Sequence, residues 1–269
     1  MFVFIATLAR ADTNNANTLT PQERASGWRL LWDGQTSKGW RSVRSQEFPT
    51  KGWVIRDGML IVLAGNGGEL AVGEDIITTE RYSDLELSAD FKIVEGANSG
   101  IKYFVRSNVD PVTGSRKEAS LGAAIGYEFQ ILDDARHPDA KLGRDGNRTL
   151  GSLYDLIPPG PGKHPNAIGE WNTARIAVKG GHVEHWLNGA KVLEFERGTP
   201  EFRARVAASK FSVIPDFGSW AEGHILLQNH GGEVSFRNLK IRTPSTNRTV
   251  RSDKATREAR RGSTAQPTR

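Results

Sequence analysis

The chain has 269 residues, no cysteine and a formal net charge of +5. The absence of cysteine excludes a disulfide framework and a cysteine-ligated metal. The positive charge belongs to residues 243–269, which hold seven Lys/Arg against two Asp/Glu and leave 29 of each sign in residues 1–242. Residues 1–242 therefore have no net positive charge that would indicate binding to nucleic acid.

The chain begins with an apolar run, residues 1–11, about as long as the hydrophobic region of an export signal. Ala9 and Ala11 have the spacing of an Ala-x-Ala cleavage site, although no positively charged start precedes the run. The run is far shorter than the ~20 residues that span a membrane. We therefore expect a shortened export signal, a periplasmic or secreted protein without a transmembrane segment, and a polar linker over residues 12–26.

Residues 27–242 contain many short strand patterns separated by turn residues. The strongest hairpin signal is Asp57-Gly58 between two apolar runs, because both central residues of a type I′ turn need a positive φ. Residues 83–93 alternate apolar and polar side chains, as a half-buried strand does. The pattern predicts one all-β domain at residues 27–242, a two-sheet antiparallel jelly-roll sandwich with a concave face.

The later part of the predicted domain has three notable segments. Residues 135–169 lack a strand pattern, and loops of that length are usually functional or disordered, so we expect a lid over the site. Residues 201–210 are expected to form the one substantial helix, and residues 223–231 and 233–241 a closing hairpin. Residues 243–269 are rich in Ser, Thr and Arg and poor in apolar side chains, which predicts a disordered basic tail.

The strand pattern at residues 126–134 is the main pointer to a site. Alternate side chains of a strand lie on opposite faces, so Tyr127 and Phe129 are expected on a core face, with Glu128 and Gln130 on the other. The run ends in two carboxylates, the first of them Asp133. Taken alone, the pattern is better explained by an edge strand with a solvated polar face, and the other motifs of the chain favour a site.

Histidines supply the other candidates for proton transfer. His230 shares a strand face with Gln228, and His185 lies close to an Asn-Gly turn. His230 precedes two glycines, so a water-exposed turn histidine is the alternative for it. His137 falls in the predicted lid. Arg237 is either a surface cation or a group that positions a substrate oxygen. The sequence motifs of zincins, α/β-hydrolases and P-loop proteins are absent.

Several motifs occur in an order that resembles one family, the DUF1080 family, also called 3-keto-disaccharide hydrolases. They are Asn98-Ser99-Gly100-Ile101, residues 127–134, Gly169-Glu170-Trp171-Asn172, residues 185–189, residues 227–231 and residues 236–241. The resemblance covers roughly residues 27–242. It implies the concanavalin A-like lectin/glucanase fold, export from a bacterium, and cleavage of glycosides already oxidised at sugar C3 through a lyase and hydratase sequence.

That reaction sets chemical requirements for a site. A ketone at C3 acidifies the C2 hydrogen, so a base, an acid for the departing C1 oxygen and a partner for the enolate oxygen are needed. We expect proton transfer or cation binding to involve His230, His185, Glu128 and Asp133. The candidates for binding sugar hydroxyls are Gln130, Asn98, Asn172, Gln228, Tyr154, Arg237 and His137. The sequence assigns neither base nor acid, and it leaves open whether Glu128 and Asp133 hold a divalent cation.

Two other functions remain open at this point, both with a carbohydrate as partner. The first is a non-catalytic carbohydrate-binding module that uses the tryptophans of the chain. The second is an ordinary endo-glucanase, because the Glu-x-Gln-x-x-Asp spacing from Glu128 resembles the Glu-x-Asp-x-x-Glu strand of retaining glucanases. Gln130 cannot titrate, which weakens this second alternative. The assembly state is not predicted.

Overall fold

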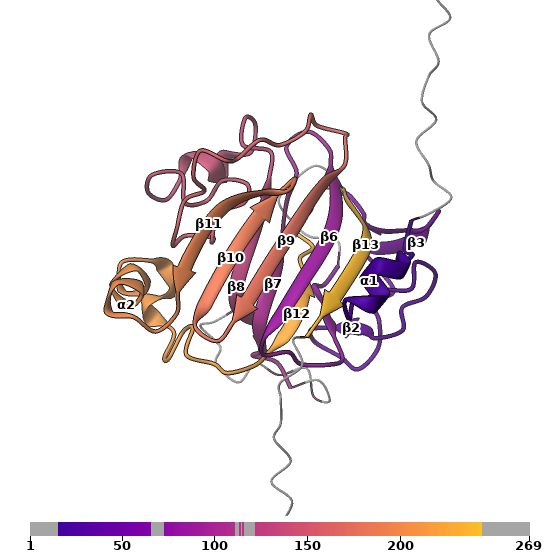
Figure 1. Ribbon diagram of the computed structural model, residues 1–269, viewed down its shortest axis with the longest axis horizontal. Coiled ribbons are helices and arrows are strands. Elements are labelled where there is room, and N and C mark those ends of the chain that lie inside the picture. The colour runs from indigo at the N-terminus through magenta and orange to yellow at the C-terminus, as the bar shows by residue number, and fades with distance from the viewer. Residues whose placement is uncertain (1–15, 66–72, 111–112, 114, 116–121, 244–269) are drawn as a thin grey trace, which may run out of the picture.

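The computed structural model of the protein describes residues 16–65, 73–110, 113, 115 and 122–243. The predicted export signal (1–11) and almost all of the predicted tail lie outside the described residues. The described part consists of two antiparallel sheets packed face to face, with few helices (Figure 1). The prediction of an all-β, two-sheet jelly-roll sandwich is confirmed.

The larger sheet has eight strands. They are β1 (Arg29–Leu30), β3 (Trp53–Arg56), β4 (Met59–Val62), β6 (Leu85–Ile93), β9 (Asn172–Lys179), β10 (His182–Leu187), β11 (Ala190–Glu196) and β13 (Val234–Arg242). Their order is β11-β10-β9-β6-β13-β4-β3, and β1 pairs with β13 beyond the end of β4.

The smaller sheet has five strands and lies behind the larger one in Figure 1. Its strands are β2 (Trp40–Ser42), β5 (Ile76–Thr78), β7 (Asn98–Ser107), β8 (Ala124–Leu132) and β12 (His224–Leu227), in the order β2-β5-β12-β7-β8. The helical segments are α1 (Pro21–Ala25), η2 (Pro138–Lys141), α2 (Pro200–Ala207) and η3 (Lys210–Val213). Within the described residues, every helix is too short or too polar to cross a bilayer.

The core lies between the sheets and follows from the period of two. In β6 the apolar side chains from Leu85 to Ile93 are buried, and the polar ones between them lie on the outer face. Tyr127, Phe129 and Ile131 of β8 contribute to the same core from the facing sheet, as predicted. Each fully buried side chain of this size stabilises the fold by roughly 1.5–3 kcal/mol.

The hairpin predicted at Asp57-Gly58 is confirmed. It joins β3 to β4, and its two central residues have φ of 53° and 69°. Both angles are positive, as a type I′ turn requires, and glycine reaches that region without a steric penalty.

The predicted closing hairpin is wrong. β12 pairs with β5 and β7 in the smaller sheet, whereas β13 pairs with β6, β4 and β1 in the larger one. Two strands joined by a short glycine-containing connection resemble a hairpin in sequence, but here the connection crosses from one sheet to the other. Asn229 N donates to Asp75 Oδ1 at 2.9 Å, and Gly65 N donates to Gly231 O at 2.8 Å, which secures this crossing.

The described part of the predicted linker, residues 16–26, is folded onto the domain. Thr20 caps helix α1 and forms a capping box with Glu23. Lys240 of β13 lies 2.7 Å from the Glu23 carboxylate, and Asn17 N donates to Asn238 Oδ1 at 2.6 Å. The polar composition that suggests a linker reflects side chains that hold this segment against β13 of the larger sheet.

His185, a predicted catalytic residue, is a core residue. It alternates with buried Val183 and Leu187 on β10 and is itself fully buried between the sheets. Its Nε2 lies 3.0 Å from Tyr103 Oη, and its Nδ1 lies 3.3 Å from Gly151 O. A neutral ring satisfies both contacts if Nδ1 donates and Nε2 accepts. Burial lowers the pKa of His185 to about 3. The prediction that His185 takes part in proton transfer is wrong.

The buried imidazole predicts a pH-dependent stability. Below its ordinary pKa of about 6.5, His185 takes up a proton in the unfolded chain but stays neutral in the folded one down to about pH 3. As the pH drops from about 6.5 towards 3, the free energy of unfolding should therefore fall by roughly 1.4 kcal/mol for each pH unit. Urea unfolding from pH 7 to pH 4.5 measures the slope of unfolding free energy against pH. This slope should be shallower in the His185→Leu variant, which lacks the contribution of the imidazole.

His164, which is exposed, provides the matched control. The His164→Leu variant should keep the wild-type slope. An equal slope in the wild type and His185→Leu would contradict the neutral buried imidazole, whatever the substitution costs in absolute stability.

Candidate active site

A pocket of about 280 Å³ lies on the face of the smaller sheet turned away from the core. Mostly polar and charged side chains from five parts of the chain surround it. The lining residues are Asn98, Lys102, Glu128, Gln130, His137, Pro138, Asp139, Leu142, Tyr154, Lys210, Gln228 and His230.

The pairing of β7 with β8 builds the floor of the pocket. Lys102 lies directly opposite Glu128, and Gly100 lies opposite Gln130. These side chains share one face of the sheet because residues two apart on a strand point the same way. Gly100 is required here, since a Cβ at this position would overlap the Glu128 carboxylate and lie 2.9 Å from its Cδ.

Lys102 and Glu128 form an ion pair at the bottom of the pocket. Lys102 Nζ lies 3.5 Å from Glu128 Oε2, and the two side chains are 13% and 7% exposed. Burial alone would lower the pKa of Lys102, but the carboxylates of Glu128 and Asp75 outweigh it and raise that pKa. The ammonium therefore stays charged inside the pocket.

Side-chain amides complete the surroundings of Glu128. In the orientation that satisfies its neighbours, the Gln130 nitrogen donates to Glu128 Oε1 at 3.0 Å and to Ser99 O at 3.3 Å. The Gln228 nitrogen lies 3.3 Å from the same carboxylate oxygen, and its oxygen lies 3.3 Å from Lys102 Nζ. The buried Asn98 amide lies 3.2 Å from the other end of Gln130. Three predicted binding residues thus surround the charged pair.

His230 reaches the pocket from the connection that crosses between the sheets. Its Nδ1 is buried and forms no hydrogen bond to any residue that the structure describes. Asp75 lies nearby: burial raises the pKa of its carboxyl, while the charges of Lys102 and His230 oppose that rise. An imidazole with a free nitrogen beside a carboxylate and an ammonium can take up or release a proton at the pocket.

The predicted lid forms one wall of the pocket. Its residues 151–154 run along the free edge of β8, where Gly151 N donates to Gln130 O at 2.9 Å and Tyr154 N to Glu128 O at 3.0 Å. Tyr154 Oη donates to Asp139 Oδ2 at 2.8 Å, and Arg148 joins Asp139 to Asp155 at 3.0 and 2.7 Å. Burial raises the pKa of Tyr154, so its hydroxyl remains a donor. Tyr154 and His137 therefore line the pocket as predicted.

Lys210, the first residue of η3, also lines the pocket. The residue as a whole is exposed, but its Nζ packs 4.0 Å from the centre of the Tyr154 ring. Partial burial lowers the pKa of Lys210. The positive charge of Lys102 lowers it further, whereas the negative charge of Glu128 acts in the opposite direction. Its backbone N donates to Asp155 Oδ2 at 2.8 Å, which fixes η3 to the wall.

Asp133 is not a pocket residue, so its predicted catalytic role is wrong. Its carboxylate is buried and accepts from Gly96 N at 2.8 Å, Ala135 N at 3.1 Å and Arg136 N at 3.3 Å. These bonds satisfy backbone donors where β8 ends, which is a common use of Asp after a strand.

Asn172 and Arg237 also lie outside the pocket. Asn172 is buried beside the Asn-Gly turn, and its Oδ1 accepts from Asn166 N and Asn188 Nδ2 at 2.8 and 2.9 Å. Arg237 lies on the outer face of the larger sheet, 3.6 Å from Asp90 and stacked 4.1 Å from the centre of the Trp171 ring. The predicted roles of both residues in binding substrate are wrong.

The tryptophans also lie elsewhere. None of the seven Trp lines the pocket; Trp32, Trp40, Trp53 and Trp220 are buried. The aromatic side chain at the pocket is Tyr154. The module alternative, in which tryptophans bind the sugar, therefore loses its main support at this site.

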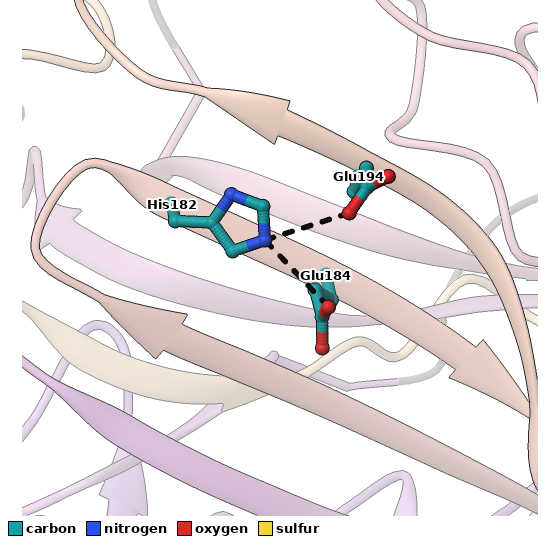
Figure 2. Close-up of side chains that lie close together, drawn as sticks. All are labelled: His182, Glu184 and Glu194. Atoms are coloured by element: carbon teal, nitrogen blue, oxygen red, sulfur yellow. Dashed lines mark ion pairs between the residues drawn. The ribbon is translucent and has the colours of Figure 1, made fainter.

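A metal-compatible group exists on the opposite side of the molecule. Figure 2 shows His182 pointing toward Glu184 and Glu194, with its Nε2 3.6 Å from each carboxylate. Lys191 Nζ lies 2.6 Å from Glu194 and 3.4 Å from Glu184, so an ammonium already neutralises this cluster. In the pocket, Glu128 and Asp139 are likewise paired with Lys102 and Arg148. A divalent cation at the active site stays a prediction, and no step below depends on one.

Sequence reasoning missed Lys102, Lys210, Asp139 and Asp75. The signal for Lys102 was available, because it is two residues from Gly100 and four from Asn98 on a strand. Lys210 and Asp139 sit in 3-10 turns, and Asp75 lies just before a strand, so no periodicity connects them with the site.

Comparisons with known proteins agree with this architecture. The family described as the 3-keto-alpha-glucoside-1,2-lyase-like domain matches residues 27–242. A curated 3-keto-disaccharide hydrolase from Bacteroides thetaiotaomicron is 36% identical over 234 residues, which cover 81% of this chain and 79% of that protein.

A solved structure shows the same fold. A crystal structure of a protein from Parabacteroides distasonis superposes with a TM-score of 0.70 at 30% identity, covering 85% of this chain and 99% of the other. A second structure from that organism gives a TM-score of 0.49 at 25% identity, over 76% and 98% of the two chains.

The family match and the curated relative indicate a glycoside-cleaving enzyme built on a jelly-roll sandwich. Within that class, the chain belongs to the family of 3-keto-alpha-glucoside-1,2-lyase-like domains, as the resemblance indicated.

The buried ion pair makes a prediction about stability. The Lys102→Met variant should lose roughly 2–3 kcal/mol of unfolding free energy, because Glu128 is left as an unpaired charge in the pocket. In a double-mutant cycle, Lys102→Met with Glu128→Gln should cost less than the sum of the single variants, as measured by urea unfolding.

Arg81 supplies the control, since it forms an exposed pair with Glu222 at 3.2 Å. The Arg81→Met variant should change stability by about 1 kcal/mol or less. Additive effects of Lys102→Met and Glu128→Gln would show that the pair contributes nothing to the fold.

Proposed function

We propose that the protein cleaves 3-keto-glycosides by removing the C2 proton, eliminating the C1 substituent and adding water to the product. The observation that carries this proposal is a buried ammonium, Lys102, beside a carboxylate and a histidine on the floor of one pocket. The family match and the name of the curated relative support the substrate class.

The elimination needs two proton transfers. His230 takes the C2 proton, and the C–H electron pair forms a C2=C3 bond as negative charge moves to the C3 oxygen. When that charge returns to re-form the C3 ketone, the electron pair of C2=C3 becomes a C1=C2 bond. The C1–O bond then breaks, and the leaving oxygen takes a proton.

Lys102 is suited to the charge that develops at the C3 oxygen. A fixed ammonium in a partly dry site stabilises an enolate oxygen, and it needs no reorganisation as the charge appears. Glu128 and Asp75 keep Lys102 protonated, while Glu128, Gln130 and Gln228 hold it in place. Gln130, Gln228, Asn98 and Tyr154 offer donors and acceptors to sugar hydroxyls.

Hydration reverses the chemistry at the same groups. Water adds its hydroxyl to C1 of the enone and gives its other proton to the group that protonated the leaving oxygen, while C2 receives a proton from His230. Both groups thereby return to their starting protonation states. The sum of the two steps is hydrolysis. One histidine thus acts as base and then as acid, as an imidazole can near neutral pH.

An ordinary glucanase mechanism has less support. Retaining enzymes place two carboxyl groups ~5–5.5 Å apart. Here β8 contributes Glu128 to the pocket, Gln130 next to it cannot titrate, and Asp133 is committed to backbone donors outside it.

Solvent deuterium tests the mechanism directly. In D2O, cleavage of a 3-keto-glucoside should yield 3-keto-glucose with deuterium at C2, because the His230 imidazolium exchanges its proton with solvent before it protonates C2. The parent glucoside, with a hydroxyl at C3, should not be cleaved. NMR of the product measures the incorporation, with the product incubated alone as control. Cleavage without deuterium at C2, or cleavage of the parent, would overturn the proposal.

Substitution of His230 tests the proton transfer. The His230→Ala variant should lose roughly 100-fold or more in kcat, as expected for removal of a general base, while remaining folded. The same substitution at His164, which is exposed and not among the pocket residues, should leave kcat unchanged. If the two variants behave alike, His230 is not the base.

A further inference from the structure

A second cleft continues from the pocket. Its volume is about 300 Å³, and it shares Lys102, Glu128 and Lys210 with the first. The two hollows therefore adjoin at Lys102, Glu128 and Lys210.

The chemical character changes at Lys210. Apart from the three shared residues, every described residue that lines the second cleft is apolar or glycine: Gly122, Ala124, Ile125, Gly126, Phe211, Val213 and Ile214. The first pocket, by contrast, is lined by amides, carboxylates, histidines and ammonium groups. The two compartments therefore suit different halves of one molecule.

The apolar lining is arranged as a rigid surface. Phe211 stacks on Phe217 with ring centres 4.3 Å apart and planes 8° from parallel. Val213 is 73% exposed and adds an accessible apolar side chain to this surface. A sugar would need hydrogen-bonding groups here, whereas an aromatic or alkyl group needs only this apolar contact.

We propose that the second cleft is the leaving-group subsite, that it takes an apolar, preferably aromatic, aglycone, and that Lys210 donates the proton to the departing oxygen. The proposal rests on the function proposed above, because that function places the sugar ring against Lys102 and Glu128. The C1–O bond then lies at the junction of the two compartments, where Lys210 stands.

Lys210 and water complete the proton balance of this step. As the C1–O bond breaks, its electron pair stays with the leaving oxygen, which takes a proton from the Lys210 ammonium. The neutral amine regains a proton from water, which reaches it because the residue is exposed. Partial burial, which lowers the pKa of Lys210, makes this ammonium a better acid than an ordinary lysine.

Substrates that differ only in the leaving group test the subsite. Phenyl and methyl 3-keto-glucosides of one anomer, and a 3-keto-disaccharide of that anomer, would be compared by kcat/KM. We expect the phenyl compound to be preferred at least 10-fold over the other two. A disaccharide that equals or exceeds the phenyl compound overturns the subsite but leaves the proposed function standing. Failure to cleave any of the three, the methyl compound included, overturns the proposed function itself.

Val213→Asn tests the same subsite from the protein side, since an exposed position tolerates the change without unfolding. It should lower kcat/KM for the phenyl compound at least threefold and leave the methyl compound unchanged. Equal effects on both would contradict an aglycone contact at Val213.

A leaving-group series tests the role of Lys210. The Lys210→Met variant should lose 100-fold or more with the methyl compound, whose oxygen needs a proton to depart. With a 4-nitrophenyl compound, whose oxygen leaves as an anion, the loss should be less than 10-fold. A structural role for Lys210 would lower both rates equally, and that result would overturn its assignment as proton donor.

Discussion

The ion pair between Lys102 and Glu128 is the constraint on which the rest of the site depends. Two charges removed from bulk water stabilise a protein only when their geometry and remaining hydrogen bonds are satisfied. Gln130 and Gln228 supply those bonds, Asp75 adds a second negative charge behind the ammonium, and Gly100 leaves the space that the carboxylate fills. A site arranged in this way holds a positive charge in place before substrate arrives.

The packing of the sandwich also holds the pocket side chains in position. One strand, β8, places Tyr127 and Phe129 in the core and Glu128 and Gln130 in the pocket, so the packing that fixes the first pair also fixes the second. The crossing connection after β12 acts similarly, because its backbone bonds to Asp75 and Gly65 hold the segment that carries His230. The contacts that stabilise the fold therefore also fix the positions of the side chains in the pocket.

The sequence predicts the parts of this site that follow a strand period and fails where they do not. Alternation is enough to identify Glu128 and Gln130 on β8, and on β7 it points to Lys102, which was overlooked. Gln228 and His230 were grouped by the same period, although both lie beyond the end of β12. The same alternation places His185 in the core between Val183 and Leu187. This pattern is stronger evidence than the nearby Asn-Gly turn, which suggested a catalytic role. Asp133 and Asn172 bond to loop backbones and amides, contacts that depend on tertiary structure. Lys210 comes from a turn about 80 residues away from β8, and only the folded chain brings the two together.

The segment that walls the pocket also has a consequence for the solubility of the protein. β8 is the last strand of its sheet, and an unpaired outer strand offers its backbone to other chains. Residues 151–154 occupy that backbone through bonds to Glu128 and Gln130. Shortening this wall to widen the substrate range would uncover the strand and invite edge-to-edge association. Engineering of the pocket is thus restricted by aggregation as well as by chemistry.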